Sequence, residues 1–247
     1  MKLYRWFPFF LFAVPIAANA GTFNLNSTSG GYNYKAQADF TYSGSILTLV
    51  LKNTQNSNTV QAGNAQILTG LFWNMNRTVT ASTANISAGS SFVDGNGNAI
   101  GTPSETPAQH WARKQGAPSW GGGANYGIGG AGFGHFGSGD AFASGGSNPV
   151  LNGVDWGIIG GNWNIPGNES PFILNSMTFT FNIGTGFDVN SISNVWFQYG
   201  SGFNEFRGTD DQFPPSEAVP EPASIAMAGF AAAAAWNGRR KLRNSKA

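Results

Sequence analysis

The residues whose types and spacing could bind a metal ion lie between positions 94 and 105. Side-chain oxygens stand at positions 1, 3, 5 and 12 of a calcium-binding loop pattern, on Asp94, Asn96, Asn98 and Glu105. Such a loop surrounds Ca²⁺ with oxygen ligands, but position 6 here is Ala99 instead of the glycine that makes the sharp turn. Because Asp-Gly and Asn-Gly are also typical of hairpin turns, we predict a turn and no metal, with calcium binding as the alternative.

The two histidines of the chain, His110 and His135, have no partner at metal-ligand spacing. Asp140 could close a site with both of them, but His110 stands beside Trp111 in loop-like sequence, and we expect it to pack against the body of the fold. No Gly-x-Ser-x-Gly elbow stands between a strand and a helix, and sequence alone does not show which carboxylates face each other. We therefore predict no catalytic residues and a protein that is not an enzyme.

A glycine motif at residues 127–132 has the G-x-G-x-x-G spacing of a dinucleotide-binding turn. That chemistry requires a strand before the motif and a helix after it, because the helix N-terminus holds the pyrophosphate. Neither element is expected here, so we predict a glycine-rich loop and no cofactor.

Charge and composition exclude several classes of protein. The whole chain has a net charge of +1, but residues 21–218 hold six Lys and Arg against eleven Asp and Glu, hence −5. An acidic, sparsely charged domain lacks the basic patch that binding to nucleic acid requires. There is no cysteine, and twenty phenylalanines and eight tryptophans supply apolar area for a core that has no disulfides.

Four tryptophans in turn-rich sequence are candidates for binding carbohydrate. They are Trp111, Trp120, Trp156 and Trp163. Exposed rings of this kind stack against the C–H faces of sugars. The alternative, which we favour, is that these rings cover the core where the strands are short.

Period-two alternation of apolar and polar residues predicts a set of short strands. A hairpin is expected over residues 36–53 and further strands over 65–75, 79–86, 156–159, 172–183 and 195–199, with Gly70 at a bulge. No segment between Gly21 and Pro214 shows convincing helical periodicity. We predict an all-β fold, a single β-sandwich or jelly-roll domain in which the early hairpin and the late pair of strands meet in one sheet system.

A glycine-rich segment over residues 116–146 interrupts this pattern. Dense glycine disfavours regular structure, while the aromatic residues between the glycines favour a long ordered loop packed on the body and forming the rim of any ligand site. No strand pattern is visible from Gly200 onward, and Pro214 and Pro215 begin an extended linker.

The N-terminus has the three parts of a secretory signal peptide. Lys2 and Arg5 are basic, an apolar stretch follows, and Ala18 and Ala20 occupy the positions that signal peptidase recognises, so cleavage is expected before Gly21. A retained membrane anchor is the alternative. The predicted organisation is a signal peptide at 1–20, an exported domain at 21–213, a linker at 214–218 and a sorting signal at 219–247.

The C-terminus also has three parts in a fixed order. An extended motif comes first, then an uncharged apolar run over residues 225–236, and then bases; the motif is Val219, Pro220, Glu221 and Pro222, and the basic cluster is Arg239, Arg240, Lys241 and Arg243. Twelve helical residues span about 18 Å, less than the roughly 30 Å of a hydrocarbon core. The run suits a temporary anchor with its basic end in the cytoplasm; an ordinary tail-anchor helix is the alternative.

This order resembles the PEP-CTERM sorting signal of bacterial exosortase-dependent surface proteins. Degenerate motifs within the mature region, such as residues 47–54, 67–73 and 194–200, are similar to those proteins as well. The resemblance implies signal peptidase and exosortase as processing enzymes and transient contact with the inner membrane. It further implies export to the cell surface or extracellular matrix, and it carries over no catalytic residue.

The sequence therefore favours a non-enzymatic surface or matrix protein associated with exopolysaccharide or biofilm. The alternative is a carbohydrate-active enzyme, or a calcium-dependent carbohydrate-binding module, on the same β-sandwich.

Overall fold

Two consecutive hairpins form the N-terminal part of the fold. In the computed structural model, β1 (Asn19–Ser29), β2 (Tyr32–Ser43) and β3 (Ile46–Asn53) pair in sequence order. Gly30 and Gly31 have φ of 59° and 82°, and Gly44 has φ of 65°, values that side chains disfavour and tight hairpin turns require. The hairpin predicted over residues 36–53 is confirmed, whereas β1 was not predicted.

The structure describes most of the compact unit that runs from Ala18 to Phe213. The described residues are 19–55, 61–120, 122–131, 136–137, 139–142, 150–151, 153–161, 163–164, 171–202 and 204–211. The linker and the sorting signal therefore lie outside them, as does most of the predicted signal peptide. No helix in this described part of the chain is long and apolar enough to cross a membrane.

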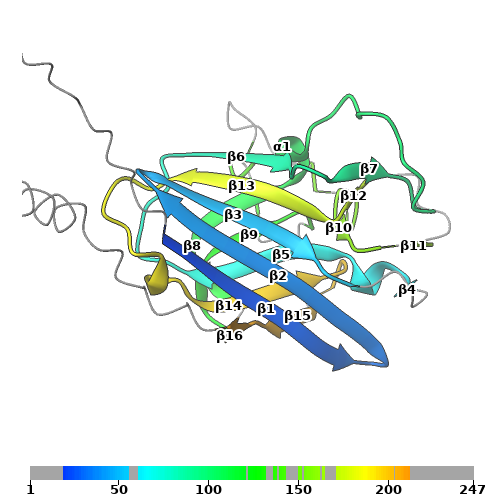
Figure 1. The fold of residues 1–247 in the computed structure, drawn as a ribbon, viewed down its shortest axis with the longest axis horizontal. Helices are drawn as coiled ribbons and strands as arrows, with labels where there is room; N and C mark the ends of the chain where they lie inside the picture. The colour runs from blue at the N-terminus through cyan, green and yellow to red at the C-terminus, as the bar shows by residue number, and fades with distance from the viewer. Residues whose placement is uncertain are drawn as a thin grey trace, which may run out of the picture. The chain divides into compact units, whose positions relative to one another are not determined.

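Among the described residues, the first sheet has six strands in the order β16-β1-β2-β3-β13-β6 (Figure 1). It adds β6 (Ala81–Ile86), β13 (Ser176–Asn182) and β16 (Thr209–Asp211) to the N-terminal hairpins. Strand β13 pairs antiparallel with β3, so that Phe179 lies opposite Leu49. The early hairpin thus pairs with one of the late strands, as predicted, whereas the other late strand, predicted over residues 195–199, belongs to the second sheet.

Within the part of the chain that the structure describes, the second sheet has eight strands, with β15-β14-β5-β10-β12-β7 in order and β9 joining β5 to β8. Its members are β5 (Leu68–Asn74), β7 (Ser91–Val93), β8 (Ala112–Trp120), β9 (Ala124–Gly129), β10 (Ile158–Ile159), β12 (Phe172–Leu174), β14 (Ser193–Tyr199) and β15 (Asn204–Arg207). The remaining elements are a pair of short strands, β4 (Gln61–Ala62) and β11 (Trp163–Asn164), and the short helices η1 (Asn64–Gln66), α1 (Pro107–His110) and η2 (Val189–Ser191).

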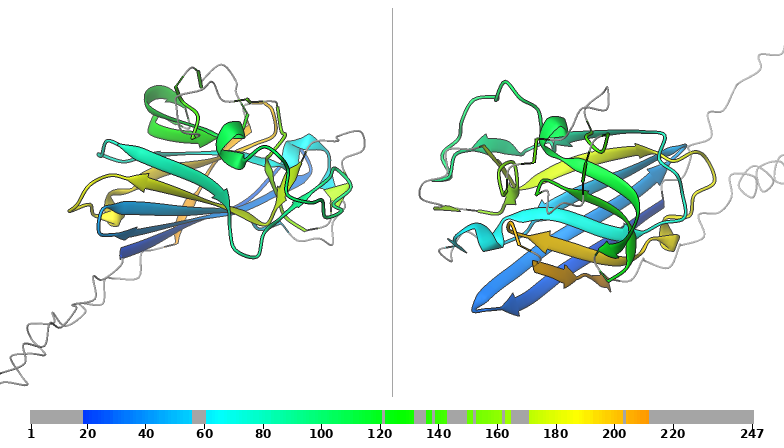
Figure 2. Two further views of the ribbon diagram at one scale, coloured as in Figure 1. Left: turned by 90° about the horizontal axis from the view of Figure 1, so that it is seen from above. Right: turned by 180° about the vertical axis from the view of Figure 1, so that it is seen from behind.

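The two sheets pack face to face around one aromatic core, as in a β-sandwich. Phe40 of the first sheet meets Trp73 of the second with ring centroids 5.5 Å apart, and Phe181 meets the same tryptophan at 5.9 Å. In the left view of Figure 2, β1 to β3 (blue) belong to one layer and the β8–β9 hairpin (green) to the other. Burial of this apolar area is the main source of stability for a chain without disulfides.

At two places a single residue connects a strand of one sheet to a strand of the other. Asn175, with φ of 82°, separates β12 of the second sheet from β13 of the first, so the single strand predicted over 172–183 is two strands in different sheets. Gly208 connects β15 to β16 in the same way. A Cβ at Gly208 would lie 2.8 Å from the ring of Phe197, so only glycine fits without a shift.

Two predictions of irregular structure are wrong. The segment over residues 116–146 contains the end of β8 and the whole of β9, and the chain beyond Gly200 contains β15 and β16. Glycine lies in β9 because the outer face of that strand is closely covered: a Cβ at Gly129 would lie 2.8 Å from the ring of Phe136. Of the dinucleotide-like motif, residues 127–129 are therefore the end of β9, and Gly130 and Ala131 follow in a bend.

Strand β5 carries a bulge at its start. Gln198 pairs with Gly70 and the next residue, Tyr199, pairs with Leu68, so Thr69 is the extra residue. Its hydroxyl donates to the carbonyl of Gly200 at 2.8 Å. The predicted bulge thus exists, one residue before the glycine to which the sequence analysis assigned it.

Candidate functional site

The segment that has a calcium-loop spacing folds as a turn, as predicted. One carboxylate oxygen of Asp94, Oδ1, accepts from the backbone N–H of Asn96 at 2.9 Å and of Asn98 at 2.8 Å, and Oδ2 accepts from the Asn98 amide at 3.2 Å. The hydrogen bond from the Asn98 backbone is the main cause of a lowered Asp94 pKa. The carboxylate therefore stabilises its own turn, and donors occupy the oxygens that a cation would need.

The fourth calcium candidate, Glu105, contacts a histidine. Its Oε2 lies 2.9 Å from Nε2 of His110, while Nδ1 of the same ring lies 2.9 Å from the carbonyl oxygen of Val150. His110 is buried at the end of α1, and it stacks on Trp156 with ring centroids 4.3 Å apart. It packs against the body of the fold, as predicted, and His135 lies outside the described residues.

Two of the four tryptophan candidates are core residues. Trp111 is fully buried and donates from Nε1 to the carbonyl oxygen of Trp156 at 3.0 Å. Trp156 is buried as well. For these two rings, the prediction that they cover the core is confirmed. The side chains of Trp120 and Trp163 lie outside the described part of the structure.

The tryptophan that sequence reasoning missed is Trp196 on β14. It is half-buried, whereas the inward neighbours Val195 and Phe197 are buried. Its Nε1 donates to Oδ1 of Asn194 at 2.9 Å, and Arg207 of β15 lies directly opposite it. The period-two pattern of residues 195–199 contains the signal, since it places Trp196 on the outward face of a strand.

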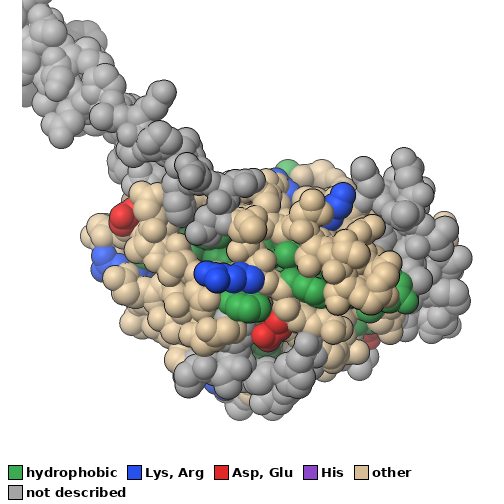
Figure 3. Space-filling view, turned by 90° about the horizontal axis from the view of Figure 1, so that it is seen from below, with side chains coloured by type: hydrophobic (Ala, Val, Ile, Leu, Met, Phe, Trp, Pro, Cys, Tyr) green, Lys and Arg blue, Asp and Glu red, His purple; other side chains and the backbone are tan. Residues whose placement is uncertain are grey.

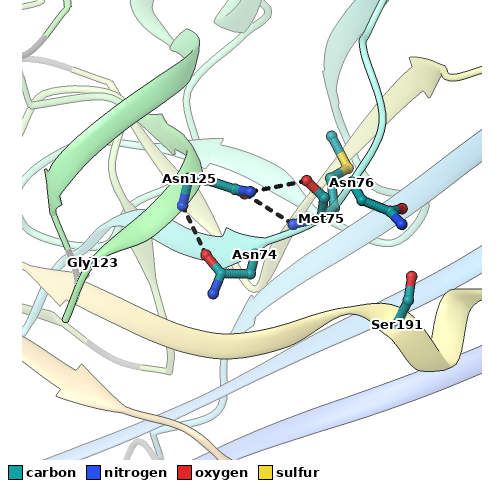
Figure 4. A pocket seen from close by; sticks show the side chains of 6 residues that line it. All are labelled: Asn74, Met75, Asn76, Gly123, Asn125 and Ser191. Atoms are coloured by element: carbon teal, nitrogen blue, oxygen red, sulfur yellow. Dashed lines mark hydrogen bonds between the residues drawn. The ribbon is translucent and has the colours of Figure 1, made fainter.

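A polar hollow lies where β5 ends and β9 begins (Figure 4). We call it the amide hollow; it measures about 350 Å³ and is lined by Asn74, Met75, Asn76, Gly123, Asn125 and Ser191. Asn125 fixes its geometry. The side chain of Asn125 accepts from the N–H of Met75 at 2.9 Å and donates to the carbonyl of Met75 at 3.1 Å, while its backbone N–H donates to Oδ1 of Asn74 at 2.9 Å.

The lining of a second hollow begins at Ser193, two residues after Ser191 of the first. We call it the arginine hollow; it measures about 490 Å³ and is lined by Ser193, Asn194, Val195, Arg207, Gly208 and Thr209. The described residues that line the two hollows include no Asp, Glu or His. They offer amide groups, hydroxyls and one guanidinium, which suit hydrogen bonding to a polar ligand.

Two further carboxylates hold neighbouring strands and turns in place. Asp39 lies 2.9 Å from the Lys52 ammonium and accepts from the Thr22 hydroxyl at 2.9 Å. Asp140 accepts from the backbone N–H of Gly137 at 2.7 Å and lies 3.7 Å from the Lys114 ammonium. Within the described residues, no group of three His, Cys, Asp or Glu side chains could hold a metal ion.

The predicted signal-peptidase site falls at the start of β1. Ala18 lies outside the described residues, Ala20 is exposed, and Gly21 is buried opposite Phe40. Cleavage before Gly21 would leave nine residues of the eleven-residue β1 in the mature protein. Most of the pairing between β1 and β2 would therefore remain after the signal peptide is cleaved.

Comparison with known families identifies the C-terminal segment. The model of the PEP-CTERM protein-sorting motif matches residues 218–241, a range that includes the Val219–Pro222 motif and the first three bases of the cluster. The chain thus carries the sorting signal of an exported protein that exosortase processes. No curated protein and no solved structure matches the chain.

Proposed function

We propose that this protein is a non-enzymatic component of the cell surface or extracellular matrix that associates with exopolysaccharide. The sorting motif over residues 218–241 is the observation that carries the proposal, since it directs the folded domain to the cell exterior. The β-rich domain between the two targeting ends would then be the functional part of the mature protein.

The non-enzymatic role is supported by the way in which the described acidic side chains are used. Glu105 binds a buried histidine, Asp94 binds its own turn, and Asp39 binds a lysine on the neighbouring strand. Glycoside hydrolysis would need two carboxyl groups facing each other across a substrate. The described linings of both hollows consist of uncharged side chains and one arginine instead.

The surface of the domain is consistent with a role in a polysaccharide-rich environment. In Figure 3, the described part of the visible face is mostly polar and uncharged, with a few separate charged side chains and small apolar groups. Such a surface offers hydrogen bonds to hydroxyl-rich polymers without a strong electrostatic field.

The delivery part of the proposal is tested by altering the sorting signal in the producing cells. Deleting residues 219–247, or replacing Pro220 and Glu221 with alanine, should leave the protein exported but absent from the surface fraction. Mass spectrometry of the surface-bound wild type should give an N-terminus at Gly21 and no basic tail. Recovery of a surface-bound form that is intact through Ala247 would overturn the proposal.

A further inference from the structure

The amide hollow and the arginine hollow are lined by residues that lie close together in the chain and in space. Ser191 lines the first and Ser193 the second. Gly123 lines the first, and the adjacent Gly122 accepts a hydrogen bond from the side chain of Asn194, which lines the second, at 3.3 Å. Only a short stretch of structure separates the two hollows, so a chain-like ligand could occupy both.

We propose that these two hollows form a single binding surface for an uncharged, hydroxyl-rich polysaccharide. This inference rests on the proposed association with exopolysaccharide and names the site and the chemical class of the polymer. The surface contains the amide hollow, Trp196 beside it and the arginine hollow.

The amide hollow provides the groups that recognise sugar hydroxyls. Oδ1 of Asn74 is held by Asn125, which leaves the Asn74 amide nitrogen as a donor. The amide of Asn76 is exposed, and the Ser191 hydroxyl, which donates to Asp188, can still accept. An amide presents a donor and an acceptor side by side, which matches two adjacent hydroxyls of a sugar ring.

Trp196 supplies the apolar contact that a sugar face requires. Its ring is oriented by the hydrogen bond to Asn194, and it packs on Gly122, where a Cβ would come within 2.6 Å of the ring. Of the tryptophan side chains that the structure describes, Trp73, Trp111 and Trp156 are buried, and Trp196 alone is half-buried. A held ring with an accessible part can stack on the C–H face of a pyranose.

Three of the lining asparagines, Asn74, Asn125 and Asn194, are held in position before any ligand arrives. The Asn125 side chain makes two hydrogen bonds to Met75. Asn194 has φ of 53°, and its side chain contacts both Gly122 and Trp196. A site held in this way loses little conformational entropy on binding, which benefits a weak ligand such as a sugar.

The charge of the surface points to a neutral polymer. Arg207 is the one ionisable side chain among the described residues that line the two hollows. The domain as a whole is acidic, at −5 over residues 21–218 from six basic and eleven acidic side chains, and it would repel an acidic polymer. Binding through amides, hydroxyls and a ring should depend little on salt, because only charge–charge contacts are screened.

Affinity electrophoresis of the full-length chain tests the proposal. The probes are dextran, hydroxyethylcellulose, galactomannan, acidic alginate and the exopolysaccharide of the producing cells. The variants are Asn76→Ala, which removes an exposed amide, and Asn194→Gly, which keeps the positive φ but removes the side chain. Asn85→Ala is the matched control, since Asn85 is an exposed asparagine on β6 of the other sheet. Thermal melts confirm that each variant is folded.

We expect at least one neutral polymer to retard the wild type, with both site variants at least fivefold weaker and the control unchanged. Raising NaCl tenfold should alter the retardation less than twofold. If the site variants bind a polymer as the wild type does, the site is wrong while the proposed function stands. If alginate binds best and salt abolishes its binding, the proposal that the ligand is an uncharged polysaccharide is wrong. If none of the probes is bound, the polysaccharide association itself is wrong.

Discussion

His110 and Trp156 stack nearly parallel in the interior, with an interplanar angle of 8° and ring centroids 4.3 Å apart. Trp156 reaches this position with φ of 62°, a conformation that costs a non-glycine residue energy. The carbonyl of Trp156 accepts the indole N–H of Trp111 at 3.0 Å. The stacked pair therefore joins α1, the loop at Val150 and the turn before β10 into one buried cluster.

His110→Leu should weaken the domain. It leaves the carbonyl of Val150 without its ring partner and removes the contact with Glu105, and loss of such a hydrogen bond at a buried site costs about 1–3 kcal/mol. Urea denaturation would measure the change in the free energy of unfolding. Glu105→Gln is the matched control, because the Glu105 side chain is 56% exposed and should contribute less. A histidine variant as stable as the wild type would show that the cluster is not structural.

Phe179→Ala should destabilise far more than Thr180→Ala. Phe179 is fully buried and packs on Trp111 and Phe142, so its removal leaves a cavity that costs about 3–5 kcal/mol. Thr180 lies on the opposite face and shares an exposed hydrogen bond of 2.7 Å with Thr83, which is worth about 1 kcal/mol. Chemical denaturation of both variants gives the comparison. Equal losses would mean that both faces of β13 are covered.

The Asp94 turn should make a pH-dependent contribution to stability. Its carboxyl has a pKa lowered from 3.8, first by the Asn98 backbone hydrogen bond, so the folded state holds the proton less tightly than the unfolded state. The stabilisation is therefore fully present above the unfolded value and is lost as the pH falls through the lowered folded value. Thermal melts of wild type and Asp94→Asn should differ at pH 7 and converge at the acid end. A difference that stays constant across this range would contradict the assignment.

Period-two sequence patterns predicted the strands with one buried and one exposed face. Strand β13 alternates between threonine and large apolar residues, and its pairing with β3 follows from the matching pattern of Leu47, Leu49 and Leu51. Strand β9 could not be predicted in this way, because Gly127 and Gly129 have no side chain to mark a face. Contacts with other parts of the chain specify strand β9. Gly129 pairs with Gly70 of β5, and the ring of Phe136 covers Gly129.

The candidate site was predicted poorly for a related reason. Asn74 and Asn125 are 51 residues apart, and the hydrogen bond that joins them depends on the pairing of β5 with β9. The Asp94 segment was recognised by its spacing, but spacing did not show that the turn amides already occupy its oxygens. Trp196 could have been assigned to an outward face from alternation alone, whereas the hydrogen bond that orients its ring could not.

Gly129→Ala tests whether the glycines of β9 are required by close packing. The added Cβ would lie 2.8 Å from Cε2 of Phe136, so the ring or the strand must move. Overpacking of this kind typically costs about 1–3 kcal/mol. Gly101→Ala is the matched control, because nothing lies within 4 Å of a Cβ at that position and its φ is not in the positive region.

Urea denaturation of the two alanine variants shows whether β9 needs glycine because Phe136 packs on it or whether glycine is only a spacer there. If glycine serves in β9 only as a spacer, Gly129→Ala will be neutral or slightly stabilising, since alanine loses less conformational entropy on folding. If Phe136 packs directly on the strand, Gly129→Ala will be clearly less stable than Gly101→Ala. Shortening Phe136 to leucine in the Gly129→Ala background should then restore part of the loss, because it removes the ring atoms that the new methyl group meets.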